Sequence, residues 1–174
     1  DLDGDQDLYF GYVIGHYFEN EEGVFAEKTM EYEIENDGSR GVVVGDIDNN
    51  GYPDILKWRY LFSTSVEHQV LMNQGNHQFN TAQYLDNEYM QYLHSQGLLD
   101  VDLDGDLDIV AVEKQGDTQF HCYKLNEGNN ELDGPNYILA YSYDRDDENS
   151  SSRTLAIADF DGDGDQDVYI PRKE

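Results

Sequence analysis

Residues 159–167, Asp-Phe-Asp-Gly-Asp-Gly-Asp-Gln-Asp, place five carboxylates on alternate positions, with a glycine at the sixth. On a tightly turned loop such carboxylates can converge, and without a cation they would repel one another. Oxygen ligands in this number suit Ca²⁺, which takes six to eight oxygens, better than Zn²⁺, which prefers nitrogen and sulfur. The stretch predicts a calcium loop, followed by the strand-forming residues 168–170.

The same pattern recurs along the chain. Residues 100–108 repeat its acids and its glycine, and residues 46–54 repeat it with Asn50 at the fifth position. Residues 1–7, aligned on Gly4, supply positions three to nine of a further loop. Recurrence at intervals of about 50 residues indicates one repeated supersecondary unit.

The candidate ligands follow from this alignment. We expect side chains at positions one, three, five and nine, and a backbone carbonyl at position seven. The candidate metal-binding residues of the three complete loops and the partial one are Asp1, Asp3, Asp5, Asp7, Asp46, Asp48, Asn50, Tyr52, Asp54, Asp100, Asp102, Asp104, Asp106, Asp108, Asp159, Asp161, Asp163, Asp165 and Asp167.

An EF-hand is the nearest alternative calcium motif. Its loop needs a glutamate at position twelve and a helix on either side. Position twelve is Lys57, Ala111 and Ile170 in the three complete loops, and the flanking residues are strand-forming. The EF-hand is therefore excluded.

A second landmark accompanies the loops. Residues 17–25 and 71–79 share an apolar-x-Asn-x-x-Gly-like turn ending in phenylalanine, and residues 123–128 hold a degraded copy. Such turns join two antiparallel strands. Strands are expected at 8–14, 41–45, 54–62, 68–73, 78–84, 97–99, 108–113, 118–125, 136–143, 155–158 and 167–170.

Four short antiparallel strands in about 50 residues are typical of one blade of a β-propeller. The predicted class is all-β, with about three such blades in repeats at about 1–40, 41–95, 96–153 and 154–174, the last one incomplete. Polar links are expected at 33–40, 85–95 and 144–153. Trp58 is predicted to lie in the core between blades rather than to form a sugar platform.

Composition narrows the function classes. The 174 residues carry 38 acids against 10 bases, a net charge of −28, which repels nucleic acid and anionic membranes. No apolar run approaches the ~18 residues of a membrane helix. The single cysteine, Cys122, allows no internal disulfide and is expected to be a small buried residue.

The loops at 46–54, 100–108 and 159–167, the partial loop at 1–7 and the turns at 20–25 and 73–79 resemble the FG-GAP/VCBS repeat family, the blades of integrin-α-like propellers. The resemblance implies a propeller of usually seven blades, with Ca²⁺ bound between the first two strands of a blade. It implies an extracellular or cell-surface location. No catalytic residues carry over from this family. Because the chain holds only about three repeats, we expect it to be a fragment of a longer propeller.

The preferred hypothesis is a secreted or cell-surface calcium-binding propeller segment that acts in adhesion, extracellular structure or scaffolding, with no enzymatic activity. The alternative is an accessory or lectin-like propeller of an extracellular polysaccharide-active enzyme, with Tyr89 and Tyr92 as a candidate glycan-binding rim. Expected partners are a protein or glycan on the extracellular side, or further blades or subunits. Asn149 lies in a glycosylation sequon.

Overall fold

The computed structural model describes residues 2–11, 14–32, 34, 39–61, 65–84, 93–115, 118–128, 136–143 and 154–171. Within these ranges every regular element is a β-strand. None of the described segments forms a helix long and apolar enough to span a membrane. The prediction of an all-β protein is confirmed.

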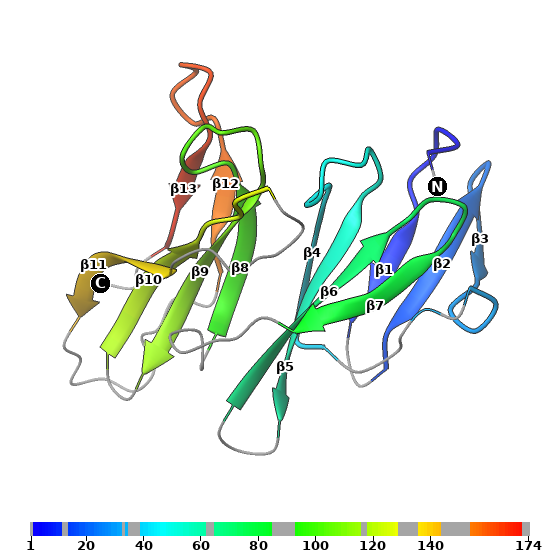
Figure 1. The fold of residues 1–174 in the computed structure, drawn as a ribbon, viewed down its shortest axis with the longest axis horizontal. Coiled ribbons are helices and arrows are strands. Elements are labelled where there is room, and N and C mark those ends of the chain that lie inside the picture. Colours follow the sequence, from blue (N-terminus) through cyan, green and yellow to red (C-terminus); the bar gives the residue numbers. More distant parts are fainter. Residues whose placement is uncertain are drawn as a thin grey trace.

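The strands form four antiparallel sheets in which neighbours along the chain are neighbours in the sheet (Figure 1). The strands are β1 (Leu8–Phe10), β2 (His16–Glu21) and β3 (Val24–Glu27) in the first sheet; β4 (Gly41–Gly45), β5 (Asp54–Leu61), β6 (Ser65–Asn73) and β7 (Phe79–Tyr84) in the second; β8 (Leu93–Leu99), β9 (Asp108–Gln115), β10 (Thr118–Lys124) and β11 (Asn136–Tyr143) in the third; and β12 (Ala156–Ala158) and β13 (Asp167–Tyr169) in the fourth. The described sheets do not close into a ring.

The first three sheets pack face to face, and each of the two interfaces between them contains its own apolar core. Successive side chains of a strand point to opposite faces, so Ile55 and Leu56 of β5 enter different cores. Ile55 packs with Tyr17 of the first sheet. Leu56 packs with Ile109 and Ala111 of the third sheet. The second sheet is thus buried on both faces. This explains why consecutive residues of β5 are both apolar.

Trp58 lies in the core between the second and third sheets, as predicted, and only 7% of its surface is exposed. Its ring covers Gly41 on the neighbouring strand β4, where an added Cβ would lie 1.8 Å from the ring. Glycine at this position therefore makes room for the tryptophan.

Several strand ends differ from the predictions. β6 begins at Ser65 rather than at residue 68, because the β5–β6 pairing continues to Leu61 and Ser65. β8 begins at Leu93 rather than at residue 97, because Leu93 pairs with Glu113. Both extensions include polar residues, and residues 93–95 were expected in the link 85–95. β1 ends at Phe10 rather than at residue 14.

Other predictions fall outside the described residues. Tyr89, Tyr92 and Asn149 lie there, together with most of the three predicted links. Cys122 belongs to β10, but its side chain is outside the description.

Candidate metal centre

Each acidic loop coils through two residues of left-handed backbone. At position four φ lies between 56° and 80°, in Leu2, Asn49, Leu103 and Gly162. At position six φ lies between 91° and 110°, in Gly4, Gly51, Gly105 and Gly164. Side-chain-bearing residues rarely adopt the second range, which explains the glycine there. Leucine at position four is strained, since only Gly, Asn and Asp visit this region readily.

The carboxylate at position one is held by the backbone of its own loop. Asp46 accepts hydrogen bonds from the N–H groups of Asn50 (3.0 Å) and Gly51 (2.9 Å). Asp100 accepts the equivalent bonds from Asp104 (3.1 Å) and Gly105 (3.0 Å). In the last loop Asp159 accepts bonds from Gly162 (2.7 Å) and Gly164 (3.1 Å). The coil thereby orients the first candidate ligand.

The residue at position five closes a small turn in every loop. Its side-chain oxygen accepts a hydrogen bond from the N–H of position seven. The pairs are Asp3 with Asp5 (3.1 Å), Asn50 with Tyr52 (2.8 Å), Asp104 with Asp106 (3.0 Å) and Asp163 with Asp165 (3.0 Å). Asx turns of this kind are a reason for Asp and Asn in tight loops.

The aspartate at position nine connects the loop to the hairpin that follows it. Asp54 is fully buried and accepts hydrogen bonds from the N–H groups of Ile47 (2.8 Å) and Asn73 (2.7 Å). Asp108 is also fully buried, and its oxygens accept bonds from the N–H groups of Val101 (2.7 Å) and Asn126 (2.8 Å). The position-nine carboxylate thus hydrogen-bonds to both recurring motifs, the acidic loop and the hairpin turn.

The hairpin asparagine completes this connection with its side chain. In Asn73 the amide Nδ2 donates to the carbonyl of Pro53, at loop position eight, while Oδ1 accepts a bond from the N–H of Gly75. Asn126 makes the same two contacts with Leu107 and Gly128. The sequence pattern predicts these asparagines only as turn residues. Their recurrence after each loop was the available signal for a role beside the loops.

The partial first loop follows the same plan. Asp7 accepts hydrogen bonds from the N–H of Asn20 (2.9 Å) and from the hydroxyl of Tyr17 (2.7 Å). Burial and the Asp7 carboxylate raise the pKa of Tyr17, so its hydroxyl keeps its proton. Asp5 accepts a bond from the N–H of Glu22. Asp1 lies outside the described residues.

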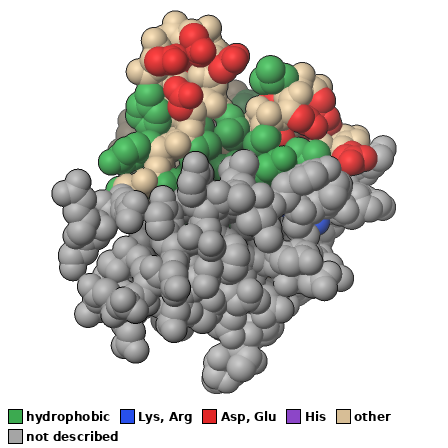
Figure 2. All heavy atoms as spheres, turned by 90° about the vertical axis from the view of Figure 1, so that its left-hand side faces the viewer, with side chains coloured by type: hydrophobic (Ala, Val, Ile, Leu, Met, Phe, Trp, Pro, Cys, Tyr) green, Lys and Arg blue, Asp and Glu red, His purple; other side chains and the backbone are tan. Residues whose placement is uncertain are grey.

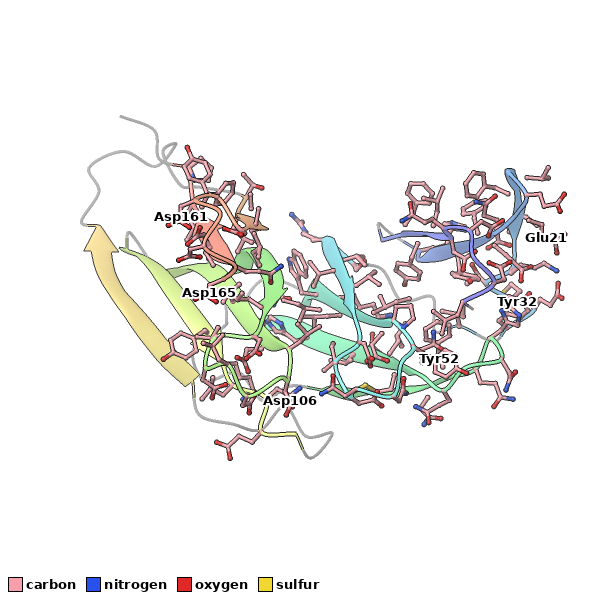
Figure 3. All side chains as sticks on the ribbon, turned by 90° about the horizontal axis from the view of Figure 1, so that it is seen from above. Glu21, Tyr32, Tyr52, Asp106, Asp161 and Asp165 are labelled. Atoms are coloured by element: carbon pink, nitrogen blue, oxygen red, sulfur yellow. The ribbon has the colours of Figure 1, made fainter. Side chains whose placement is uncertain are left out.

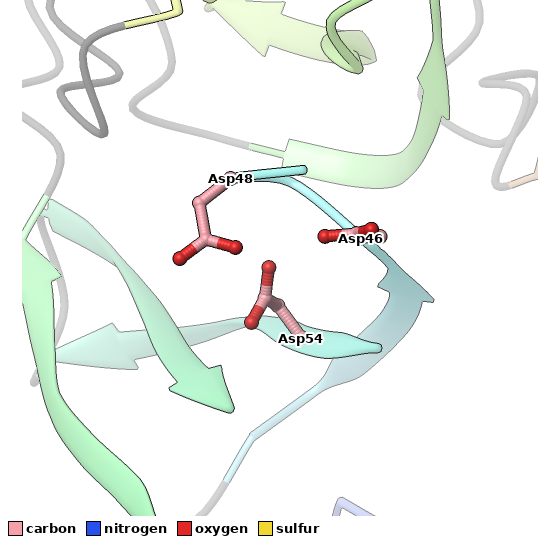
Figure 4. Close-up of side chains that lie close together, drawn as sticks. All are labelled: Asp46, Asp48 and Asp54. Atoms are coloured by element: carbon pink, nitrogen blue, oxygen red, sulfur yellow. The ribbon is translucent and has the colours of Figure 1, made fainter. Parts of the chain in front are cut away.

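In the three complete loops the carboxylates at positions one, three and nine converge. Figure 4 shows this arrangement for Asp46, Asp48 and Asp54. In each group one oxygen from each residue lies within 4.8 Å of the others. Oxygens that bind one Ca²⁺ at 2.3–2.6 Å lie at most about 5 Å apart, so the groups fit this ion. The other two groups are Asp100, Asp102 and Asp108, and Asp159, Asp161 and Asp167.

Positions five and seven do not belong to these groups. Asn50 instead donates from Nδ2 to Asp48 (3.2 Å) and to the carbonyl of Asn73 (2.8 Å). Coordination by the side chains at position five and by the carbonyls at position seven stays a prediction.

Burial makes the position-nine carboxylates difficult to ionise without a cation. Loss of hydration raises the pKa of Asp54 to about 6, with a contribution from the Asp48 charge, although hydrogen bonds from the backbone of Asn73, Ile47 and Asp48 act in the opposite direction. Burial likewise raises the pKa of Asp108, with contributions from Asp102 and Asp104. A bound cation would offset this penalty, because it favours the ionised form.

The four loops lie at one edge of the molecule, at the top of Figure 1. Seen from above, the loop residues Tyr52, Asp106 and Asp165 follow one another across the successive sheets (Figure 3). Viewed from the end that carries the last sheet, acidic side chains gather on this upper edge, above hydrophobic ones (Figure 2). The candidate sites thus form a row along one side.

The second, third and fourth sheets each carry an acidic, glycine-containing loop between their first two strands. Residues 100–170 match the family model of the FG-GAP-like repeat, which confirms the predicted resemblance for this part of the chain. Comparison with curated proteins found no match.

Proposed function

We propose that this protein is part of an extracellular β-propeller in which calcium ions stabilise the blades. The observation that supports it best is the convergence of three carboxylates in each of three loops, two of which lie in the segment that matches the FG-GAP-like repeat. Calcium would act structurally, by neutralising these carboxylates and holding the loop between the first two strands of each sheet.

The exposed end faces support a propeller. At one end Leu8 and Phe10 of β1 are exposed, although the equivalent Ile55 and Lys57 of the second sheet are buried between sheets. At the other end Tyr169 is 58% exposed, whereas the equivalent Leu56 is fully buried. Exposed apolar faces of this kind need a cover. We infer that further sheets of the same type cover them, as in a ring of usually seven blades.

The proposed role is adhesion, extracellular structure or scaffolding, through a protein or glycan partner and without catalysis. Calcium sites of extracellular modules bind in the 10⁻⁴–10⁻³ M range, which suits an ion used as a structural component outside the cell. The burial of Trp58 removes one candidate sugar platform from the lectin-like alternative.

Thermal melting with and without calcium tests the proposal. At free calcium of one to ten times Kd, each occupied site adds about 0.4–1.4 kcal/mol of stability. Excess chelator should therefore lower the melting temperature, and added calcium should restore it. An unchanged melt in chelator would exclude the structural role of calcium.

Single substitutions locate the effect. Asp102→Ala or Asp161→Ala removes one oxygen from a group and should abolish binding at that site alone. Glu21→Gln removes one negative charge from an exposed strand position away from the three groups, and should leave the calcium response intact. Equal losses in all three variants would point to a general charge effect.

A glycan array distinguishes the lectin-like alternative. Binding without turnover that is lost in Tyr89→Ala and Tyr92→Ala would favour a carbohydrate-binding propeller. Turnover of a polysaccharide by the chain alone would contradict the non-catalytic role.

A further inference from the structure

We propose that the loops at 46–54 and 100–108 bind calcium with positive cooperativity, because Asn126 and Asn49 join the two sites. This inference rests on the calcium binding proposed above. It concerns how one site affects the next, which no single loop determines.

The first connection is a buried chain of hydrogen bonds between the two position-nine carboxylates. Asp54 accepts a bond from the N–H of Ile47 (2.8 Å), and the carbonyl of Ile47 accepts one from Nδ2 of Asn126 (2.8 Å). The N–H of Asn126 in turn donates to Asp108 (2.8 Å). All four residues are at most 2% exposed. Hydrogen bonds in so dry an environment are strong and tolerate little displacement.

The second connection is exposed and runs in the opposite direction. Asn49, at position four of the first loop, donates from Nδ2 to the carboxylate of Asp106 and to the carbonyl of Gly105 (3.5 Å). Both acceptors belong to the second loop, at positions seven and six. The two loops thus hold each other at two separate points.

These contacts favour positive coupling. A cation at the first loop would fix Asp54 and the Ile47 peptide group, and would thereby fix Asn126 and Asp108 of the second. The second ion then meets ligands that are already ordered, so its binding costs less conformational entropy. Repulsion between the two ions acts in the opposite direction, and solvent screens it at the exposed edge.

The third loop provides an internal reference. Among the residues that the structure describes, none of those in loop 159–167 hydrogen-bonds to loop 100–108. Its site should fill independently of the other two.

Three glycine amides report the sites separately. The N–H groups of Gly51, Gly105 and Gly164 each donate to the position-one carboxylate of their own loop. Their signals in ¹H–¹⁵N spectra of the whole chain should therefore shift as each site fills with calcium.

The experiment removes the first site and observes the second. In Asp48→Ala, the calcium concentration at the midpoint of the Gly105 shift should rise about fivefold or more, the lower end of usual coupling between sites. The Gly164 midpoint should not change. An unchanged or lower Gly105 midpoint would overturn cooperativity. Absence of any shift at all three glycines in millimolar calcium would instead overturn the calcium sites themselves.

Variants of the connecting residues test the pathway. Asn126→Asp keeps the oxygen that accepts from Gly128 but loses the Nδ2 donor, so adding Asp48→Ala to it should change the Gly105 midpoint much less. Asn73→Asp makes the same chemical change at a residue whose Nδ2 donates within its own sheet. It should preserve the coupling. Equal coupling in both variants would exclude the buried pathway.

Asn49→Gly tests the exposed connection. It also tests the coupling between the two loops if the Asn126→Asp variant does not fold. Glycine suits the left-handed backbone at this position, and the matched control is Leu103→Gly at position four of the next loop. Coupling should fall in Asn49→Gly and persist in Leu103→Gly. Equal values in these two variants would exclude a role for Asn49.

Discussion

At the scale of the residue, Asp54 shows how burial converts an ordinary acid into a candidate metal ligand. Its carboxylate is fully buried, and both oxygens accept backbone hydrogen bonds. These bonds do not compensate for the lost hydration, because the pKa still rises to about 6. The residue therefore carries a cost at neutral pH that a cation can remove.

This residue predicts a pH dependence of the metal-free protein. Above pH 6 Asp54 is ionised in both the folded and the unfolded state, so the cost of burial is fully present. As the pH falls from about 6 towards 4, the folded state binds more protons, and the free energy of unfolding should rise by roughly 3 kcal/mol in total. Urea unfolding without calcium at several pH values measures this rise. Carboxyl ¹³C titration should assign it to Asp54, and a value near 4 there would contradict the prediction.

With calcium bound, the free energy of unfolding should instead fall as the pH falls, because protonation of Asp54 removes a ligand. Asp54→Asn should make the free energy of unfolding less dependent on pH, both with and without calcium. In the metal-free protein it should also lower the free energy of unfolding below about pH 4, where Asp54 is protonated, since its amide group would face a backbone N–H instead of accepting from it.

At the scale of the element, the loop and the hairpin form one unit. The position-nine aspartate and the hairpin asparagine connect the first strand pair of a sheet with the end of its third strand in the second and third sheets. The first sheet repeats this arrangement with Asp7, Gln6 and Asn20. The unit explains why both landmarks recur together.

The unit predicts a large effect of Asn73→Ala. The substitution removes the bond from Nδ2 to the carbonyl of Pro53 and the bond that Oδ1 accepts from the N–H of Gly75, and it leaves these buried polar groups without partners. The bond from Asn50 goes to the backbone carbonyl of residue 73, which the substitution keeps. The free energy of unfolding should fall by about 2 kcal/mol or more, measured by urea unfolding.

Gln74→Ala is the control for this prediction, because Gln74 is exposed in the same turn and uses its backbone N–H to bond to Gln78. It should cost less than about 0.5 kcal/mol. Similar losses in the two variants would show that the turn, and not the asparagine side chain, stabilises the unit.

At the scale of the molecule, sheets stack in chain order around two separate cores. β4 lies beside β8, and β8 lies beside β12, so the first strands of successive sheets are neighbours. The two end faces expose aromatic side chains, among them Phe10 at one end and Phe160 with Tyr169 at the other. Neither end face is covered by another sheet among the described residues.

These end faces predict self-association of the chain studied alone. Apolar faces that lack a covering sheet tend to bind each other, although the charge of −28 opposes this. Sedimentation at increasing salt and calcium should show association that grows as repulsion is screened. Phe10→Ser with Tyr169→Ser should reduce it. Met30→Ser, which changes an exposed apolar residue outside the strands, should not. Association that is unaffected by the paired substitution would contradict the role of these faces.

The sequence by itself determined the local features of this protein. The coil of each loop follows from glycine at position six and from Asx turns, which depend on residues close together in the chain. The strand pattern and the family resemblance followed from the same repeats, and the match at residues 100–170 confirms that resemblance.

Only the tertiary structure decided which oxygens converge and what joins one site to the next. The sequence predicted side-chain ligands at positions one, three, five and nine of each loop, and in the structure the carboxylates at positions one, three and nine form the groups. Full burial of Asp54 and Asp108 comes from packing between sheets. The bond from Asn126 to Ile47 spans 79 residues, and no local pattern encodes a contact that depends on how two sheets meet.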